Sequence, residues 1–282
     1  MEPDLLSSLP VDMRLHVNSF VGSMNSLRRV SSAAYHDVNS STQRLRWTGR
    51  WGNVGIPKLL MACRVLHSFS CRNSWVTDLS PLAACRTLRK LDCSVTGVTD
   101  LASLAGMALE ELDCSHTGVS DVSALATCKL LKVLNCTLSN VSDVSALATC
   151  KMLKVLICRR TAVSDVSALV SCEMLKVLIC RQTEVRELAL LPSLEVLNVD
   201  RTNVSDLSAL VSCKMLKVLI CSHTLVLNMS HVAACTYLEV LDCRDTGVTD
   251  VSSLASCKDA QGADLQQHTR FERVVHGSLH LS

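Results

Sequence analysis

The chain has 282 residues, and its 28 lysines and arginines nearly balance its 26 aspartates and glutamates, so the formal net charge is only +2. This balance argues against a dedicated nucleic-acid binder or a membrane-surface protein, both of which carry a concentrated basic excess, and we expect neither kind of partner. Apolar residues make up 48% and charged residues 19%, which excludes wholesale disorder, and no apolar run approaches the roughly 18 residues of a transmembrane helix.

Residues 1–47 carry apolar side chains at helical spacing, which predicts two or three short helices. The region supplies a Leu-Pro pair, an aliphatic residue three before a Phe, and a Leu-x-x-Val-Ser run, and in these features it resembles an F-box. The matching residues are Leu9, Pro10, Val17, Phe20, Leu27 and Val30. The resemblance implies docking on the Skp adaptor of a cullin ubiquitin ligase. The alternative is a plain helical cap over the first repeat, which solenoids need in any case.

A linker and capping segment is predicted next, over residues 48–62. Gly49, Gly52 and Pro57 interrupt any periodic pattern there. The basic residues just upstream, Arg44 and Arg46, are assigned to the same connecting stretch.

An internal repeat of mostly 22 residues fills residues 63–258. The segment VSDVSALATCKMLKVL at 141–156 returns as VSDVSALVSCEMLKVL at 163–178, and aligning on Leu-x-x-Leu-x-Cys gives nine repeats. Their first places are Leu66, Leu88, Leu109, Leu131, Leu153, Leu175, Leu194, Leu216 and Leu238. The pattern resembles the short leucine-rich repeat of internalins and of the regulator of type-1 protein phosphatase. The resemblance implies an α/β solenoid, curved, with parallel strands on the concave face and short helical turns on the convex face.

The 16 cysteines fall into two columns of this alignment, at the sixth place and three residues before each first place. Both columns are core positions that usually hold Leu, so we interpret the cysteines as small buried hydrophobic residues. Adjacent strands would bring the sixth-place thiols close enough for disulfides, which is the alternative. No secretion signal is visible after Met1, which favours a reducing compartment and a cytoplasmic or nuclear location.

Two polar columns have structural explanations. The ninth place is Ser or Thr in every repeat, where leucine-rich repeats usually carry Asn, and each hydroxyl can satisfy one backbone group. The thirteenth place is an acid or an amide, as at Asp121, and precedes a Ser-Ala-Leu segment, so it is predicted to cap a short helical turn. A calcium site would need more oxygen ligands than one Asp per repeat supplies, and we expect no metal and no cofactor.

The remaining places, the second, third, fifth, seventh and eighth, are predicted to face outward from the strands. Repeats four to six place a basic centre there, between acidic residues in repeats three and nine, with aliphatic residues interspersed. The predicted partner-binding residues are Lys132, Lys154, Arg159, Arg160, Lys176, Arg181, Ile157 and Ile179. Exposed aliphatic residues beside arginines favour a protein-binding strip. The alternative is that these residues were copied with the duplicated repeat.

Residues 259–282 break the pattern and are predicted to be a divergent tail. No phosphate loop, nucleophile elbow or metalloprotease motif occurs, so we expect no enzyme. Three hypotheses follow: a monomeric binding scaffold for a protein partner, a substrate receptor of a cullin ubiquitin ligase, or a phosphatase regulator. The last rests on the repeat resemblance alone.

Overall fold

The computed structural model describes residues 44–46, 65–250 and 252 of the chain. The F-box-like residues Leu9 to Val30, the predicted helical cap and the tail at 259–282 lie outside these residues. Within the described part, no helix has the length and apolar character that a membrane span requires.

The described residues form ten short strands, each three residues long, and neighbouring strands pair in parallel over residues 44–135 and 177–242. In the sheet the strands follow their order along the chain. They are β1 (Arg44–Arg46), β2 (Ser68–Ser70), β3 (Lys90–Asp92), β4 (Glu111–Asp113), β5 (Val133–Asn135), β6 (Val155–Ile157), β7 (Val177–Ile179), β8 (Val196–Asn198), β9 (Val218–Ile220) and β10 (Val240–Asp242).

Short 3-10 helices return the chain from one strand to the next. They are η3 (Ser80–Ala84), η4 (Ala102–Leu104), η5 (Ser123–Thr127), η6 (Ser145–Thr149), η7 (Ser167–Ser171), η8 (Ser208–Ser212) and η9 (Ser230–Ala234). Each has three to five residues, too few for a stable α-helix, and the tighter 3-10 turn fits this length. Between β7 and β8 the described chain has no helix, because that repeat is three residues shorter than its neighbours.

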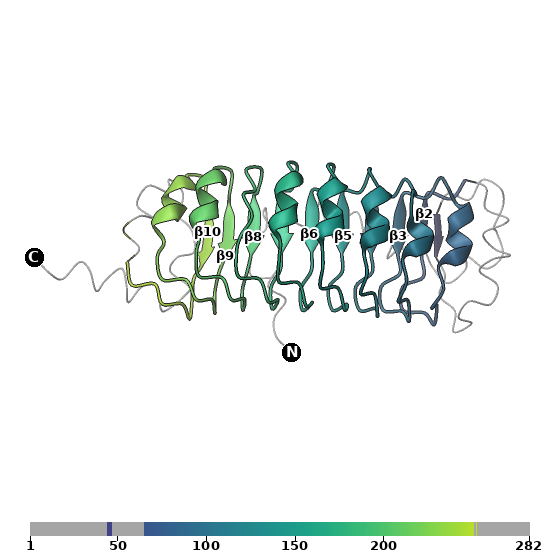
Figure 1. The fold of residues 1–282 in the computed structure, drawn as a ribbon, viewed down its shortest axis with the longest axis horizontal. Coiled ribbons are helices and arrows are strands. Elements are labelled where there is room, and N and C mark those ends of the chain that lie inside the picture. The colour runs from purple at the N-terminus through teal and green to yellow at the C-terminus, as the bar shows by residue number, and fades with distance from the viewer. Residues whose placement is uncertain (1–43, 47–64, 251, 253–282) are drawn as a thin grey trace, which may run out of the picture. The chain divides into compact units, whose positions relative to one another are not determined.

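The chain divides into two compact blocks. The first block comprises the described residues of Met1–Val141 and Thr149–Val155, and the second those of Ser142–Ala148 and Leu156–Ser282. Within each block the strands lie behind the short helices in the view of Figure 1. This arrangement confirms the predicted leucine-rich repeat solenoid of parallel strands and short helical turns.

The core of each block is built from equivalent places of successive repeats. In the third repeat Leu109, Leu112, Val119 and Leu125 are fully buried, and the other repeats from the first to the eighth bury the same places. A single repeat cannot cover its own apolar side chains, so each depends on its neighbours. The core of the described repeats is therefore aliphatic apart from Phe69.

Strand β1 is one strand more than the sequence analysis predicted. Leu45 is buried at 5% exposure and pairs in register with Phe69, so it occupies the fourth place of an additional, incomplete repeat. The sequence analysis placed the flanking Arg44 and Arg46 in a connecting segment. The repeat escaped detection because Thr42 stands at the first place and Trp47 at the sixth, where the alignment expects Leu and Cys.

The eighth place of every repeat has a left-handed backbone conformation, which the sequence analysis did not predict. The nine residues with φ between 52° and 57° are Asn73, Val95, His116, Leu138, Arg160, Gln182, Arg201, His223 and Asp245. None of these residues is glycine, so the sequence carries no residue type that predicts a positive φ at this place. The conformation lets the eighth N–H donate to the seventh carbonyl of the next repeat, as from Val95 to Ser115 at 2.9 Å.

Candidate functional site

The ninth-place hydroxyls act inside the fold. Each donates a hydrogen bond to the backbone carbonyl of the sixth place in its own repeat, at 2.5 to 2.7 Å, from Ser74 in the first repeat to Thr246 in the last. The prediction that each hydroxyl satisfies one backbone group is confirmed. These residues are structural and available for no other chemistry.

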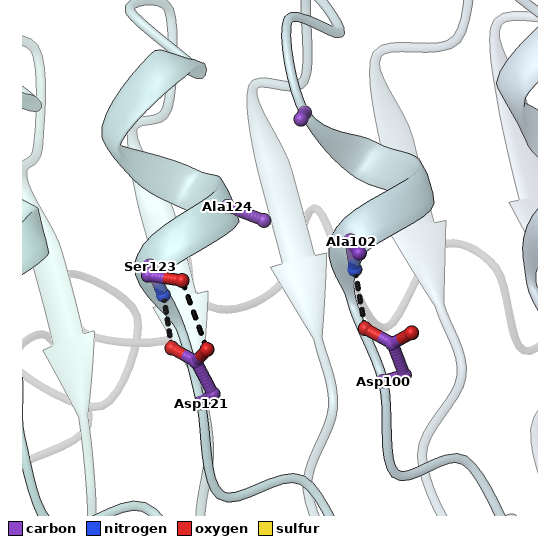
Figure 2. A pocket seen from close by; sticks show the side chains of 6 residues that line it. Asp100, Ala102, Asp121, Ser123 and Ala124 are labelled. Carbon is purple, nitrogen blue, oxygen red and sulfur yellow. Dashed lines mark hydrogen bonds between the residues drawn. The ribbon is translucent and has the colours of Figure 1, made fainter.

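The thirteenth-place acids cap the 3-10 helices, as predicted. Figure 2 shows Asp100 accepting a hydrogen bond from the N–H of Ala102 and Asp121 accepting one from the N–H of Ser123, both at 2.7 Å. Hydrogen bonds from Ser123 lower the pKa of Asp121, since they favour its charged form. Glu187 stands where the helix is missing and has no corresponding hydrogen bond among those of the described residues.

A shallow hollow of about 260 Å³ lies between η4 and η5, lined by small side chains and by these two aspartates. The hollow arises because the second repeat is one residue shorter than most, so that η4 has three residues where η5 has five. Both carboxylates are engaged as caps. The hollow is therefore a consequence of repeat length.

The described cysteines are free thiols, and all but Cys243 are buried. Many donate weak hydrogen bonds to carbonyls of the neighbouring repeat, such as Cys172 to Leu147 at 3.2 Å and Cys213 to Leu191 at 3.2 Å. Burial raises the pKa of Cys136 and of Cys180 to about 12. These thiols therefore stay protonated and unreactive, which confirms their interpretation as small core residues.

The expected strip of exposed aliphatic residues is wrong. Ile157 and Ile179 are each 8% exposed, and the third-place valines are also buried. Those valines are Val133, Val155, Val177, Val196 and Val218. These side chains are buried by the neighbouring strands. Parallel strands lie about 4.8 Å apart, so side chains at one place of successive repeats cover one another. We name the surface formed by the second, third, fifth, seventh and eighth places the sheet face.

The predicted basic residues fall in both blocks. Lys132 and Lys154 belong to the first block, where Lys132 Nζ lies 2.6 Å from Glu110 Oε2. In the second block Lys176 Nζ lies 2.6 Å from Glu195 Oε1. The sequence analysis missed both ion pairs because their partners are 19 to 22 residues away along the chain.

The arginines of the second block form an ordered network around Asp200. Arg181 is buried and its Nε lies 2.6 Å from Asp200 Oδ2, and Arg201 Nε lies 3.9 Å from the same oxygen. The exposed Arg160 donates from Nε to Gln182 Oε1 at 2.7 Å. Arg159 is half-buried beside it. Of the predicted partner-binding arginines, Arg160 is therefore solvent-facing and Arg181 is a buried partner of Asp200.

No protein-family model and no curated protein sequence matches this chain. Solved structures do resemble it. An internalin (inlF) from Listeria monocytogenes superposes with a TM-score of 0.59 at 21% identity, covering 71% of this chain and 68% of the internalin. InlJ from the same organism, whose functional domain includes a cysteine ladder, gives 0.60 at 16% identity, over 78% of this chain and 52% of InlJ.

A third similar structure is the leucine-rich repeat ectodomain of the Arabidopsis thaliana receptor kinase GASSHO1/SCHENGEN3, in complex with CASPARIAN STRIP INTEGRITY FACTOR 2. Its TM-score is 0.65 at 17% identity, over 77% of this chain and 28% of the ectodomain. At these identities the likeness shows the fold, which is that of leucine-rich repeat proteins.

Proposed function

We propose that this protein is a non-catalytic scaffold that binds a protein partner through its sheet face. The observation that carries the proposal is the buried Arg181–Asp200 ion pair on a face of the second block, with Arg201 3.9 Å from the same aspartate and Arg160 hydrogen-bonded to Gln182. Side chains that are already ordered lose little conformational entropy when a partner binds, which favours recognition.

Sequence variation within the repeats supports this proposal. The core columns repeat Leu, Val and Cys with few changes, whereas the seventh place reads Arg159, Arg181, Asp200, Ser222 and Arg244 through the second block. A scaffold copied without use would show the same residue at each step. Variation in charge along one column of a surface is typical of a surface that recognises a partner.

The charge of the network indicates the chemistry of the partner. Across repeats five to eight, the second-block sheet face carries six basic residues: Arg159, Arg160, Lys176, Arg181, Arg201 and Lys217. Only Glu195 and Asp200 oppose them there. We therefore propose that an acidic segment of a protein partner lies across this part of the face, where arginines can bind its carboxylates in pairs.

The test is charge reversal at the solvent-facing arginines. The tagged full-length protein is used to capture partners from its native cells under reducing conditions, and the main partner is identified by mass spectrometry. Arg160→Glu with Arg201→Glu should reduce its capture by at least about tenfold, the loss expected for charge-assisted contacts. Arg181 is left intact because its removal would strand the buried Asp200.

Lys214→Glu is the matched control, since Lys214 is exposed in the second block but lies outside the sheet face. It should leave capture unchanged. Equal capture by the parent and the double variant would refute the sheet face as the binding surface.

A finer version of the proposal makes the protein a substrate receptor of a cullin ubiquitin ligase, located in the cytoplasm or nucleus. It rests on the F-box resemblance of residues 1–47, and the free thiols of the described repeats fit a reducing compartment.

Leu9→Ala with Pro10→Ala should abolish binding to a purified Skp adaptor while the circular dichroism of the repeats stays unchanged. Equal binding by the variant would reduce this region to a cap and leave a plain scaffold. A phosphatase-regulator role is the remaining alternative, by repeat resemblance alone.

A further inference from the structure

Four aspartates of the sheet face are buried, and the second block neutralises both of its own. Asp200 Oδ2 lies 2.6 Å from Arg181 Nε. Asp242 binds Arg244 with two hydrogen bonds, Nε to Oδ1 at 2.9 Å and Nη2 to Oδ2 at 2.7 Å. In this molecule, then, a guanidinium accompanies each buried sheet-face aspartate of the second block.

The first block holds the other two, Asp92 and Asp113, at 6% and 7% exposure. They occupy the fifth places of β3 and β4 and are direct partners in the strand register, so the two carboxylates stand side by side on one face. Neither forms an ion pair with any described residue. Like charges in such a position destabilise a sheet.

Neutral groups hold both carboxylates in a fixed orientation. Oδ1 of Asp92 accepts hydrogen bonds from the N–H and hydroxyl of Ser94 at 3.0 and 2.6 Å, and Oδ1 of Asp113 accepts the same pair from Ser115 at 2.9 and 2.6 Å. Only longer contacts reach the Oδ2 atoms, from Ser70 at 3.4 Å and from Asn135 at 3.2 Å. The pair is thus ordered, and its outer oxygens have weak partners.

The nearby lysines are already committed to other acids. Lys90 pairs with Glu111 Oε1 at 2.6 Å, and Lys132 pairs with Glu110. Glu111 is itself buried on the same face of β4, two residues from Asp113, and its Oε2 has no hydrogen-bond partner among the described residues. Burial, and to a lesser degree the charge of Asp92, raises the pKa of Asp113. The Arg72 guanidinium donates to Ser94 Oγ at 2.9 Å rather than to either aspartate. Asp92 and Asp113 therefore lack an ion-pair partner among the described residues of the first block.

We propose that Asp92 and Asp113 form a docking site for an arginine side chain of a protein partner's basic segment. This inference rests on the proposed function of the sheet face. A guanidinium is planar, weakly hydrated and able to bind two carboxylates at once, which suits two acids one strand apart better than an ammonium does. The second block supplies a precedent for the pairing, since Arg181 and Arg244 each bind one of its buried aspartates.

The test uses a fluorescein-labelled, end-blocked peptide of sequence Gly-Ser-Arg-Ser-Arg-Ser-Gly, titrated with the full-length protein by fluorescence anisotropy at low salt. Asp92→Asn with Asp113→Asn should weaken binding by at least about tenfold, as expected for loss of charge-assisted hydrogen bonds. Glu239→Gln, an acid of the sheet face in the second block, should leave the affinity unchanged. The analogous lysine peptide should bind more weakly than the arginine peptide.

Several outcomes overturn the inference: equal affinity of the parent and the double variant, equal affinity of the lysine peptide, or no binding by the parent. Calcium chloride alone is titrated by calorimetry, and calcium binding that the double variant loses would reassign the pair to a cation. If the double variant fails to fold, Asp92→Asn alone is tested and should still weaken peptide binding.

Failure of this inference is distinguishable from failure of the proposed function. If peptide binding is absent while capture of the cellular partner still depends on Arg160 and Arg201, only the aspartate site is wrong. If charge reversal at those two arginines also leaves capture unchanged, the sheet face is not the binding surface.

Discussion

At the residue scale, the left-handed conformation at the eighth place strains the backbone. A non-glycine residue in this conformation is strained by about 1–2 kcal/mol, and asparagine tolerates it best. Val95 is β-branched and has φ 57° there, whereas the first repeat uses Asn73 with φ 54°. Val95 is partly exposed, so its side chain gains little from burial that would offset the strain.

We therefore predict that Val95→Asn stabilises the protein by about 1 kcal/mol. Urea unfolding followed by circular dichroism measures the effect. The reciprocal variant Asn73→Val should lose a similar amount. If both variants leave the unfolding midpoint in place, the eighth place is not under the strain we infer.

At the element scale, each 3-10 helix is capped by one side-chain oxygen, which is a carboxylate oxygen in every helix but η9, where Asn228 serves. Asp121 Oδ1 accepts the N–H of Ser123 and its Oδ2 accepts the hydroxyl of the same residue. Because a 3-10 helix of five residues has few internal hydrogen bonds, such a cap is a large share of what holds the turn. The seven 3-10 helices of the described repeats each follow an Asp or, in η9, Asn228, and the repeat with Glu187 has no helix.

Asp121→Ala should lower the urea midpoint of the protein, and Ser120→Ala, an exposed neighbour, should not. The effect of Asp121 should also depend on pH. Its folded pKa is lowered, so its stabilisation is present above the unfolded pKa of about 3.9 and is lost as the pH falls through the folded value. The parent and Asp121→Ala should therefore converge in stability at strongly acidic pH. A constant difference between them down to that pH would contradict the cap.

At the scale of the whole molecule, the cysteine columns make the fold sensitive to alkali. Burial raises the pKa of Cys71, Cys136 and Cys180 to about 12, while an unfolded thiol titrates near 8.5. A raised folded pKa means that stability is complete below the unfolded pKa and is lost as the pH rises toward the folded value. Each such thiol removes about 1.4 kcal/mol of stability per pH unit in this window.

Stability measured by urea unfolding in a reducing buffer should therefore fall by about 4 kcal/mol per pH unit above pH 9 from these three thiols together. Cys136→Ala with Cys180→Ala should lower stability at neutral pH, because each leaves a small cavity. The same variant should flatten the alkaline slope. An unchanged slope would show that the thiols do not govern the alkaline loss.

The candidate site shows where sequence reasoning reaches its limit. The basic residues of the second block were identified by place, because a strand alternates its faces with a period of two. Their exposure and ion pairing could not be predicted, since Arg181 is buried against Asp200 while Arg160, in the preceding repeat, faces solvent. Acidic residues were expected in repeat three, to which Asp113 belongs, whereas its partner Asp92 belongs to repeat two and was not expected to be part of a site.

The repeat, the core columns, the ninth-place hydroxyls and the helix caps could all be predicted from the amino-acid pattern. All of these are properties of one repeat and depend on residues a few positions apart, so a periodic pattern records them. Four features could be seen only in the three-dimensional structure. They are the left-handed eighth place, the strand at Leu45, the burial of the sheet-face aliphatic residues, and the pairing of the charges. These depend on what the neighbouring strand places about 4.8 Å away, and that neighbour lies some 20 residues distant in the chain.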